Sequence, residues 1–186
     1  MCEVLVTKPL TVATFNCRGV FAKPKGARHP RVVDLLTFFT NTRIDMLGLQ
    51  EPHLRVSPGG KDQERLQGWW GRYGLHSLVN AAPSGFGGTG LVWSDDWELC
   101  WAASLEPRIM FATLVSRDGL QLTVLSAHFN DKAAERRRQW EVVGRFVQRH
   151  ALTIHVSLCD HNSVIVPGVD SHTVPKSGET ADTLLA

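Results

Sequence analysis

The sequence lacks the features that would place the protein in a membrane, in a secretory route or around a zinc ion. No run of residues approaches the ~20 apolar residues that a membrane-spanning helix needs. The first ten residues contain an acid and a lysine instead of an apolar core, so we expect no signal peptide, no membrane partner and a nuclear or cytoplasmic location. The cysteines form no C-x-x-C pair, which argues against a zinc knuckle or redox motif; they are Cys2, Cys17, Cys100 and Cys159.

A strong charge of one sign is also absent. The 20 basic and 18 acidic residues give a net charge of +2, which permits a polyanionic partner without requiring one. No internal repeat, low-complexity tract or linker divides the chain, and 43% of its residues are hydrophobic, too many for a disordered protein. We therefore expect residues 1–186 to form a single domain. The segment 85–90 is rich in glycine but lacks the lysine and hydroxyl residue of a nucleotide phosphate loop.

Hydrophobic periodicity predicts many strands and at least two helices. Residues 31–40 repeat apolar side chains at helical spacing, residues 62–66 have helical character, and Asn130 is a good N-cap for a helix to about residue 148. A further short helix is possible near Glu179. Alternating or β-branched runs predict strands over 11–16, 46–50, 75–80, 91–93, 97–101, 109–116, 120–128 and 153–158. This pattern favours an α/β fold in which two mixed sheets pack face to face with helices outside.

Polar residues follow three of the apolar strands directly. They are Asn16, the pair Gln50-Glu51, and the segment 160–162. Singly, each has an ordinary interpretation, such as a turn residue, a solvated carboxylate or an Asx-turn. Because a rigid sheet can present such residues together at its edge, the set predicts a functional site there.

Four segments resemble, in order, the motifs of the endonuclease/exonuclease/phosphatase superfamily, which has the DNase-I-like fold. Residues 16–19 resemble its N-x-x-G motif, residues 47–54 its Q-E motif, residues 87–93 its glycine-led central strand and residues 157–162 its G-D-x-N motif. His53, two positions after the glutamate, is similar to the branch found in non-long-terminal-repeat retrotransposons. The resemblance implies a four-layer αββα sandwich with the active site at one edge of the sheets.

The resemblance also implies roles in cleaving a DNA phosphodiester. Glu51 and Asn16 would form the metal site for Mg²⁺ or Mn²⁺, Asp160 would direct the attacking water, and Asn162 would bind the scissile phosphate. His128 ends a strand where some branches carry a histidine that protonates the leaving oxygen. A strand-end histidine bonded to the backbone is the equally open alternative.

Other basic and aromatic residues carry weaker indications. The loop that contains Lys23, Lys25 and Arg28 is a candidate for contact with the DNA backbone. The arginine run 136–138 is expected to be a solvated helix face, because consecutive helical residues point in different directions. The pair Trp69-Trp70 is expected in the core.

Two departures from the family pattern argue against full activity. Cys159 replaces the usual glycine before the aspartate, and no S-D-H motif follows Asn162 at the spacing the family shows. Residues 170–172 have these letters in the wrong order and follow Asn162 too closely for another strand to intervene. The resemblance therefore implies a chain that lacks the final S-D-H strand region and is impaired or inactive as a nuclease.

Three functional hypotheses remain open at this point. The first is the endonuclease domain of a retroelement, which would precede a reverse transcriptase in a longer protein. The second is a non-catalytic remnant that binds metal or nucleic acid. The third is a phosphodiesterase or phosphatase of the same fold that acts on phospholipids or inositol phosphates, which His128 and the R-x-x-Q pattern at 136–139 favour and His53 opposes.

Overall fold

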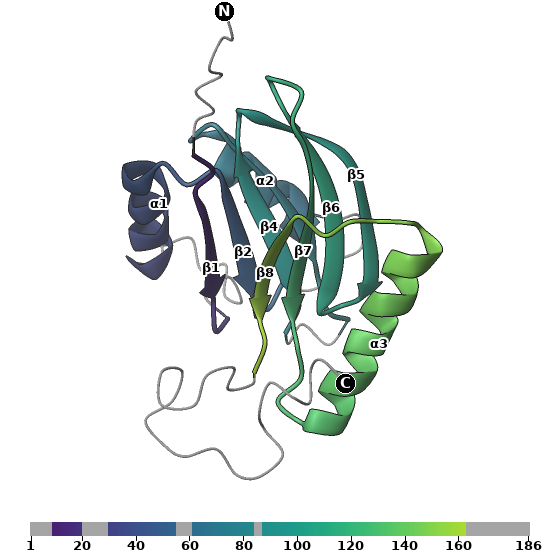
Figure 1. Ribbon diagram of the computed structural model, residues 1–186. Helices are drawn as coiled ribbons and strands as arrows, with labels where there is room; N and C mark the ends of the chain where they lie inside the picture. The colour runs from purple at the N-terminus through teal and green to yellow at the C-terminus, as the bar shows by residue number, and fades with distance from the viewer. Residues whose placement is uncertain (1–8, 20–29, 55–60, 84–86, 163–186) are drawn as a thin grey trace, which may run out of the picture.

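The computed structural model describes residues 9–19, 30–54, 61–83 and 87–162 (Figure 1). Nothing in these ranges forms a helix long and apolar enough to cross a bilayer. The elements follow one another in the order β1 (Val12–Asn16), α1 (Pro30–Thr42), β2 (Met46–Gln50), α2 (Lys61–Gly71), β3 (Leu75–Asn80), β4 (Thr89–Ser94), β5 (Trp97–Glu106), β6 (Ile109–Ser116), β7 (Gln121–His128), α3 (Ala133–Arg149) and β8 (Val156–Asp160).

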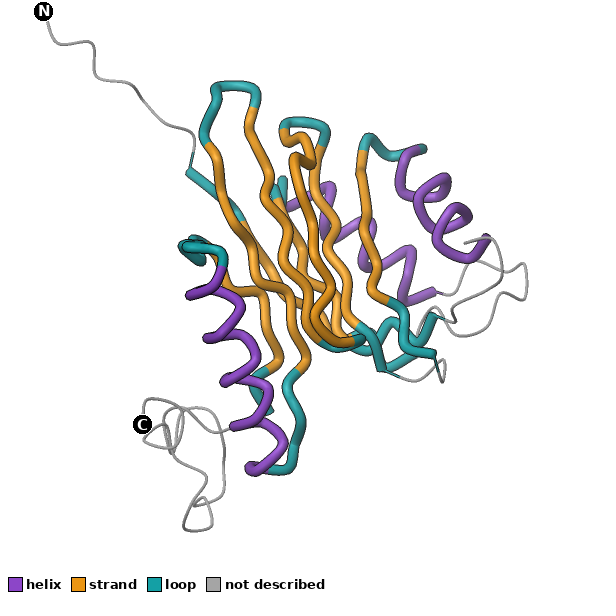
Figure 2. Tube along the Cα trace, turned by 90° about the vertical axis from the view of Figure 1, so that its right-hand side faces the viewer, coloured by secondary structure: helices purple, strands orange, loops and turns teal. Residues whose placement is uncertain are grey.

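The strands of the described residues form two mixed sheets of four strands each. The first has the order β1-β2-β4-β3 and the second β5-β6-β7-β8. In each sheet one pair is parallel, β1 with β2 and β7 with β8, and the other pairs are antiparallel. Figure 2 shows the strands in the middle, with α3 on one side and α1 and α2 on the other. The predicted αββα sandwich is therefore confirmed.

Three hydrophobic clusters fill the spaces between the four layers. Because successive strand residues face opposite sides, Leu47 packs toward α1 and α2 while its neighbour Met46 packs toward the second sheet. Trp70 is completely buried in the first cluster, as predicted, whereas Trp69 is half-buried. The clusters include Leu35, Phe39, Leu49 and Trp70 under the first two helices, Leu91, Met110 and Leu158 between the sheets, and Phe111, Phe129 and Val143 under α3.

The two sheets lie close together where β2 passes β8. A Cβ atom on Gly48 would lie 2.5 Å from the Cβ atom of Leu158, so only glycine fits at this position. Beside it, Gln50 Nε2 donates a hydrogen bond of 3.1 Å to the Leu158 carbonyl oxygen. This contact brings the carboxyl ends of β2 and β8, from different sheets, to the same place.

The predicted elements agree with the structure in type and differ mainly at their ends. The strands predicted at 46–50, 75–80 and 109–116 have the predicted bounds. The strand predicted at 97–101 continues to Glu106, the helix predicted at 62–66 covers Lys61–Gly71, and the strand predicted at 153–158 begins at Val156. The segment near Glu179 lies outside the described residues.

The prediction that Asn130 caps the third helix is wrong. The helix begins at Ala133, and its N-cap is Lys132, which makes no side-chain capping hydrogen bond. The Asn130 side chain instead accepts a hydrogen bond of 2.9 Å from the Lys132 amide, forming a local turn ahead of the helix. Capping and this turn use the same side-chain oxygen, so the sequence did not distinguish them.

Candidate active site

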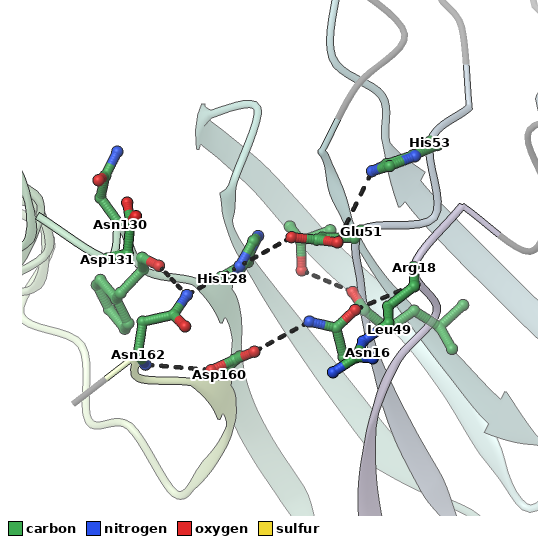
Figure 3. Close-up of polar contacts among 12 residues, drawn as sticks. Asn16, Arg18, Leu49, Glu51, His53, His128, Asn130, Asp131, Asp160 and Asn162 are labelled. Carbon is green, nitrogen blue, oxygen red and sulfur yellow. Dashed lines mark hydrogen bonds and ion pairs between the residues drawn. The ribbon is translucent and has the colours of Figure 1, made fainter. Parts of the chain in front are cut away.

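The polar residues that end four strands meet at one edge of the sandwich (Figure 3). Asn16 ends β1, Glu51 follows β2, His128 ends β7 and Asp160 ends β8. Asn162 comes two residues after β8. The sequence-predicted residues of both sheets are therefore side by side, although the basic loop with Lys23, Lys25 and Arg28, like residues 170–172, lies outside the described residues.

Asp160 is held by hydrogen bonds from both sheets. Asn16 Nδ2, from the first sheet, donates to Asp160 Oδ2 over 3.1 Å. The Asn162 backbone amide donates to Asp160 Oδ1, also over 3.1 Å. The Asn16 side-chain oxygen in turn accepts from the Arg18 amide at 3.0 Å, which fixes the orientation of the Asn16 amide group. Both carboxylate oxygens of Asp160 thus have a defined direction.

His128 links the two sheets through its Nε2 atom and is only 3% exposed. This atom lies 3.0 Å from Asn162 Nδ2 and 3.4 Å from Glu51 Oε1. Asn162 Nδ2 also donates to the Phe129 carbonyl oxygen at 2.8 Å, which identifies it as the amide nitrogen. Nε2 therefore accepts this hydrogen bond and, in the neutral ring, the proton sits on Nδ1.

Burial lowers the pKa of His128 below its ordinary value, and the positive charge of Arg108 lowers it further. The nearby carboxylates of Glu51, Asp160 and Asp131 oppose this shift. The imidazole is consequently neutral at pH 7. Its Nδ1 atom is buried and has no hydrogen-bond partner within the described ranges.

The main chain, rather than side-chain hydrogen bonds, positions Glu51. Its amide donates to the Gly88 carbonyl oxygen at 3.2 Å, and its own carbonyl oxygen accepts from the Gly19 amide at 2.9 Å. Its carboxylate, 28% exposed, has two imidazole neighbours, His128 Nε2 at 3.4 Å and His53 Nε2 at 3.8 Å. Among the described residues Glu51 is thus the site carboxylate whose oxygens remain available to a ligand.

Strained backbone is concentrated at this edge. Four non-glycine residues here have positive φ angles: Arg18 (44°), Glu51 (51°), His53 (52°) and Asn162 (47°). The two others in the described ranges follow the ends of α1 and α3, where a left-handed residue commonly terminates a helix. Each such residue costs on the order of 1–3 kcal/mol, so the cluster is maintained by its surroundings, as is common at active sites and ligand-binding sites.

Arg136 and Gln139 on α3 support the site through hydrogen bonds, and we call this pair of residues the brace. The prediction of a solvated helix face over 136–138 is wrong for Arg136. This side chain is 4% exposed, and its Nη1 atom donates to the carbonyl oxygens of Asn130 (3.1 Å), Asp131 (2.9 Å) and Asn162 (3.0 Å). Gln139 Oε1 accepts from the Asn130 amide at 2.7 Å. The spacing of three residues places both on one helix face, whereas the intervening residues are exposed.

His161 lies between Asp160 and Asn162, and the sequence analysis included it in the segment 160–162 without giving it a role of its own. Its ring stacks with those of Trp140 and Phe129, at centroid distances of 5.8 Å in each case. Burial lowers its pKa, so the ring is stacked in the neutral form. A histidine between two motif residues gives no sequence signal of its own, because its partner Trp140 is 21 positions away on α3.

Neither cysteine near the site is suited to nucleophilic catalysis. Cys159 fits an ordinary strand position, and burial raises the pKa of its thiol to about 11. Burial also raises the pKa of Cys17, and the Glu51 carboxylate adds to the shift. Both thiols are protonated at neutral pH, and the thiolate is the nucleophilic form.

The donor set suits a hard cation held by few protein ligands. No group of three or more His, Cys, Asp or Glu side chains able to hold a metal is found in the described part of the chain. Mg²⁺ commonly uses only one or two carboxylates and keeps several waters. Glu51, with its uncommitted oxygens, fits that mode, and Asp160 is already engaged by Asn16 and Asn162.

Comparisons with known proteins support the fold. No protein-family model matches the sequence, and no curated protein matches it significantly. Among solved structures, the human Nocturnin catalytic domain with bound sulfate is similar with a TM-score of 0.57 and 16% identity, over 84% of this chain and 65% of that one. An AP endonuclease from Archaeoglobus fulgidus gives a TM-score of 0.55 and 17% identity, over 86% and 60%.

The 3′ phosphatase NExo from Neisseria, bound to a product DNA hairpin, gives a TM-score of 0.58 and 12% identity, over 85% of this chain and 60% of that one. This chain thus spans less than two thirds of the length of each of these three structures. At such identities the similarity concerns architecture alone. The described part of the chain has the DNase-I-like fold, with two mixed sheets between layers of helices.

Proposed function

We propose that the strand-end residues form the active site of a divalent-cation-dependent phosphodiesterase that acts on DNA. The observation that carries the proposal is the chain of contacts from Glu51 through His128 and Asn162 to Asp160 and Asn16, which joins five polar residues from two sheets. The solved structures of similar fold include an AP endonuclease and a phosphatase bound to a DNA hairpin. Retrotransposon-like motif spacing supports a nicking endonuclease of a retroelement, which in a longer protein would work with a reverse transcriptase.

Each residue has a role that its contacts suit. Glu51 would hold Mg²⁺ or Mn²⁺, which when bound supplies charge stabilisation to the phosphoryl oxygens. Asn16 keeps the Asp160 carboxylate oriented, so that it can direct and deprotonate a water. Asn162 would donate to the phosphate by exchanging one of the two partners its amide nitrogen now has.

His128 is the residue best placed to handle a proton near Glu51. Its ring is neutral and nearly inaccessible, so it is a poor proton donor as it stands. We therefore expect residues 1–186 to cleave DNA slowly. One missing general acid typically lowers the rate by ~10²–10⁴-fold. Because Glu51 is the one uncommitted carboxylate among the described site residues, we also expect weak binding of the cation.

The cation site is tested by isothermal titration of residues 1–186 with Mn²⁺ and Mg²⁺. We expect binding by the unaltered protein and its loss in Glu51→Gln. Glu98→Gln, which removes an exposed carboxylate from β5, is the matched control and should bind as the unaltered protein does. Equal binding by both variants would remove Glu51 from the cation site and overturn the proposal.

Substrate class is tested with the same proteins. Plasmid nicking in Mn²⁺ that disappears in Asp160→Ala supports the DNA phosphodiesterase. The second candidate, a lipid or inositol-phosphate enzyme, rests on the contact of His128 with Glu51 and on the Arg136–Gln139 brace beside it. Hydrolysis of a short-chain sphingomyelin or an inositol phosphate with no nicking would favour that candidate.

A further inference from the structure

Arg108 lies in the turn between β5 and β6, at the same edge of the sandwich as the end of β7. Its carbonyl oxygen accepts a hydrogen bond of 2.9 Å from the His128 amide. Its guanidinium packs on Gly87, where an added Cβ atom would meet Nε at 3.4 Å and Nη2 at 3.7 Å. The carbonyl oxygen of Gly87 accepts a hydrogen bond from the His53 amide, and that of the adjacent Gly88 accepts one from the Glu51 amide. Arg108 thus lies directly beside the backbone that positions Glu51.

The guanidinium of Arg108 is half-buried and makes no ion pair or side-chain hydrogen bond with any described residue. The nearest acid in the sequence, Glu106, is already engaged. Its carboxylate binds Arg138 through two hydrogen bonds of 2.6 Å and 3.1 Å. Arg138 also binds Glu135, which completes a network that excludes Arg108. Within the described ranges, the turn therefore carries an uncompensated positive charge.

The charge of Arg108 reaches the site electrostatically. It is the second largest cause of the lowered pKa of His128, after burial. Because Arg108 acts on His128 and packs against the loop that holds Glu51, its guanidinium lies on the side of the site where a ligand of Glu51 would bind. A planar guanidinium offers paired donors that match two oxygens of a phosphate group.

We infer that Arg108 binds the non-bridging oxygens of a substrate phosphodiester, and so forms a phosphate subsite beside Glu51 and His128. This inference rests on the proposed function, since it assigns a substrate contact to that site. The ligand class is a phosphodiester of a nucleic acid. Gly87 suits the subsite because its φ of 79° favours glycine and its backbone lies in contact with the guanidinium.

The test is equilibrium binding of a fluorescein-labelled short DNA duplex to residues 1–186, with and without Mg²⁺, over a range of salt. Arg108→Gln should weaken binding by about tenfold or more, the effect of losing one charge-assisted contact. The magnitude of the slope of log affinity against log salt concentration should fall by about 1, the change expected when one phosphate contact is lost. Arg108→Lys, which keeps the charge but not the paired donors, should give an intermediate loss.

Arg117→Gln is the matched control, because Arg117 lies in another turn, is exposed and pairs with Asp96 at 3.7 Å. It should bind within about twofold of the unaltered protein, as expected for a solvated ion pair. Equal affinity in Arg108→Gln and Arg117→Gln overturns the inference, as does a complete lack of duplex binding by the unaltered protein. Absence of Glu51-dependent Mn²⁺ binding would instead overturn the proposed function, so the two failures are distinguishable.

Discussion

The two sheets contribute to the site in different ways. On the second sheet, both Asp160 oxygens accept hydrogen bonds, and the Asn162 side chain, amide and carbonyl oxygen are all engaged. On the first sheet, Glu51 is fixed by its backbone, while its carboxylate has imidazole neighbours only at 3.4 Å and 3.8 Å. Among the described residues, Asp160 and Asn162 are engaged by hydrogen bonds, whereas Glu51 presents an uncommitted charge.

The second-sheet residues hold one another in position, whereas the carboxylate of Glu51 is available to bind a ligand. The second-sheet half gains its rigidity from α3 through Arg136, Gln139 and the ring of Trp140. A site needs such supporting contacts to hold reactive groups in one geometry. Glu51 has no comparable support for its carboxylate in the described structure, as suits a group whose partner is a ligand.

Removing the hydrogen bonds of Arg136, a residue of the brace, should lower the free energy of unfolding more than any other change proposed here. Arg136→Met keeps most of the apolar stem but leaves the carbonyl oxygens of Asn130, Asp131 and Asn162 without their donor. We expect a loss of about 3 kcal/mol in the free energy of unfolding, measured by urea denaturation. Arg137→Met, at the exposed neighbouring position, should change it by less than about 0.5 kcal/mol. Similar losses in both variants would mean that the brace is not specific.

A substitution at the contact between β2 and β8 should affect the strands that carry both Glu51 and Asp160. Gly48→Ala places a methyl group 2.5 Å from the Leu158 Cβ atom, so the sheets must separate locally. We expect a loss of about 1–3 kcal/mol in the same denaturation experiment, the usual cost of overpacking. Gly68→Ala is the control, since nothing lies within 4 Å of its added Cβ atom in α2. It should stabilise the protein by about 0.5–1 kcal/mol.

Acid should weaken the second-sheet half selectively. Burial lowers the pKa of His161 in the folded protein below its unfolded value, so above the unfolded pKa of about 6.5 both states are neutral and stability is complete. As pH falls through about 6.5, the unfolded chain binds a proton that the folded chain does not, and stability is lost. His161→Phe keeps the stacking on Trp140 but removes this titration.

Urea midpoints at pH 7 and pH 5 would check this expectation. The decrease between the two should be smaller in His161→Phe than in the unaltered protein, which retains both His161 and His128 as sites of lowered pKa. An identical decrease would show that His161 does not contribute to acid sensitivity.

Sequence reasoning recovered the sandwich because its strands alternate or are mostly apolar, as in β2, which is buried throughout and polar only at Gln50. It also identified the strand-end residues, since Asn16, Glu51 and Asp160 each follow an apolar run directly. It missed what depends on contacts between distant segments, such as the role of Arg136. An arginine run is normally solvated, and only the position of Asn162 relative to α3 makes one member buried. Asn130 was misassigned because one side-chain oxygen can cap a helix or close a turn.

The smallest expected effect is the sharpest test of the contrast between the two halves. Asp160→Asn and Glu51→Gln make the same chemical change at two carboxylates of one site. In Asp160→Asn, the new side chain turns either its amide nitrogen or its neutral oxygen toward Asn16 Nδ2. The first orientation removes the hydrogen bond and the second replaces a charged acceptor, so we expect a loss of about 1 kcal/mol in the free energy of unfolding. In Glu51→Gln, no short hydrogen bond to the carboxylate is removed, and we expect a change below about 0.5 kcal/mol in the free energy of unfolding in metal-free buffer.

Adding Mn²⁺ should raise the unfolding temperature of the unaltered protein and leave that of Glu51→Gln unchanged, because a ligand stabilises only the state that binds it. A large loss in metal-free Glu51→Gln would show that this carboxylate is a structural group, and the contrast between a hydrogen-bonded Asp160 and an uncommitted Glu51 would not hold.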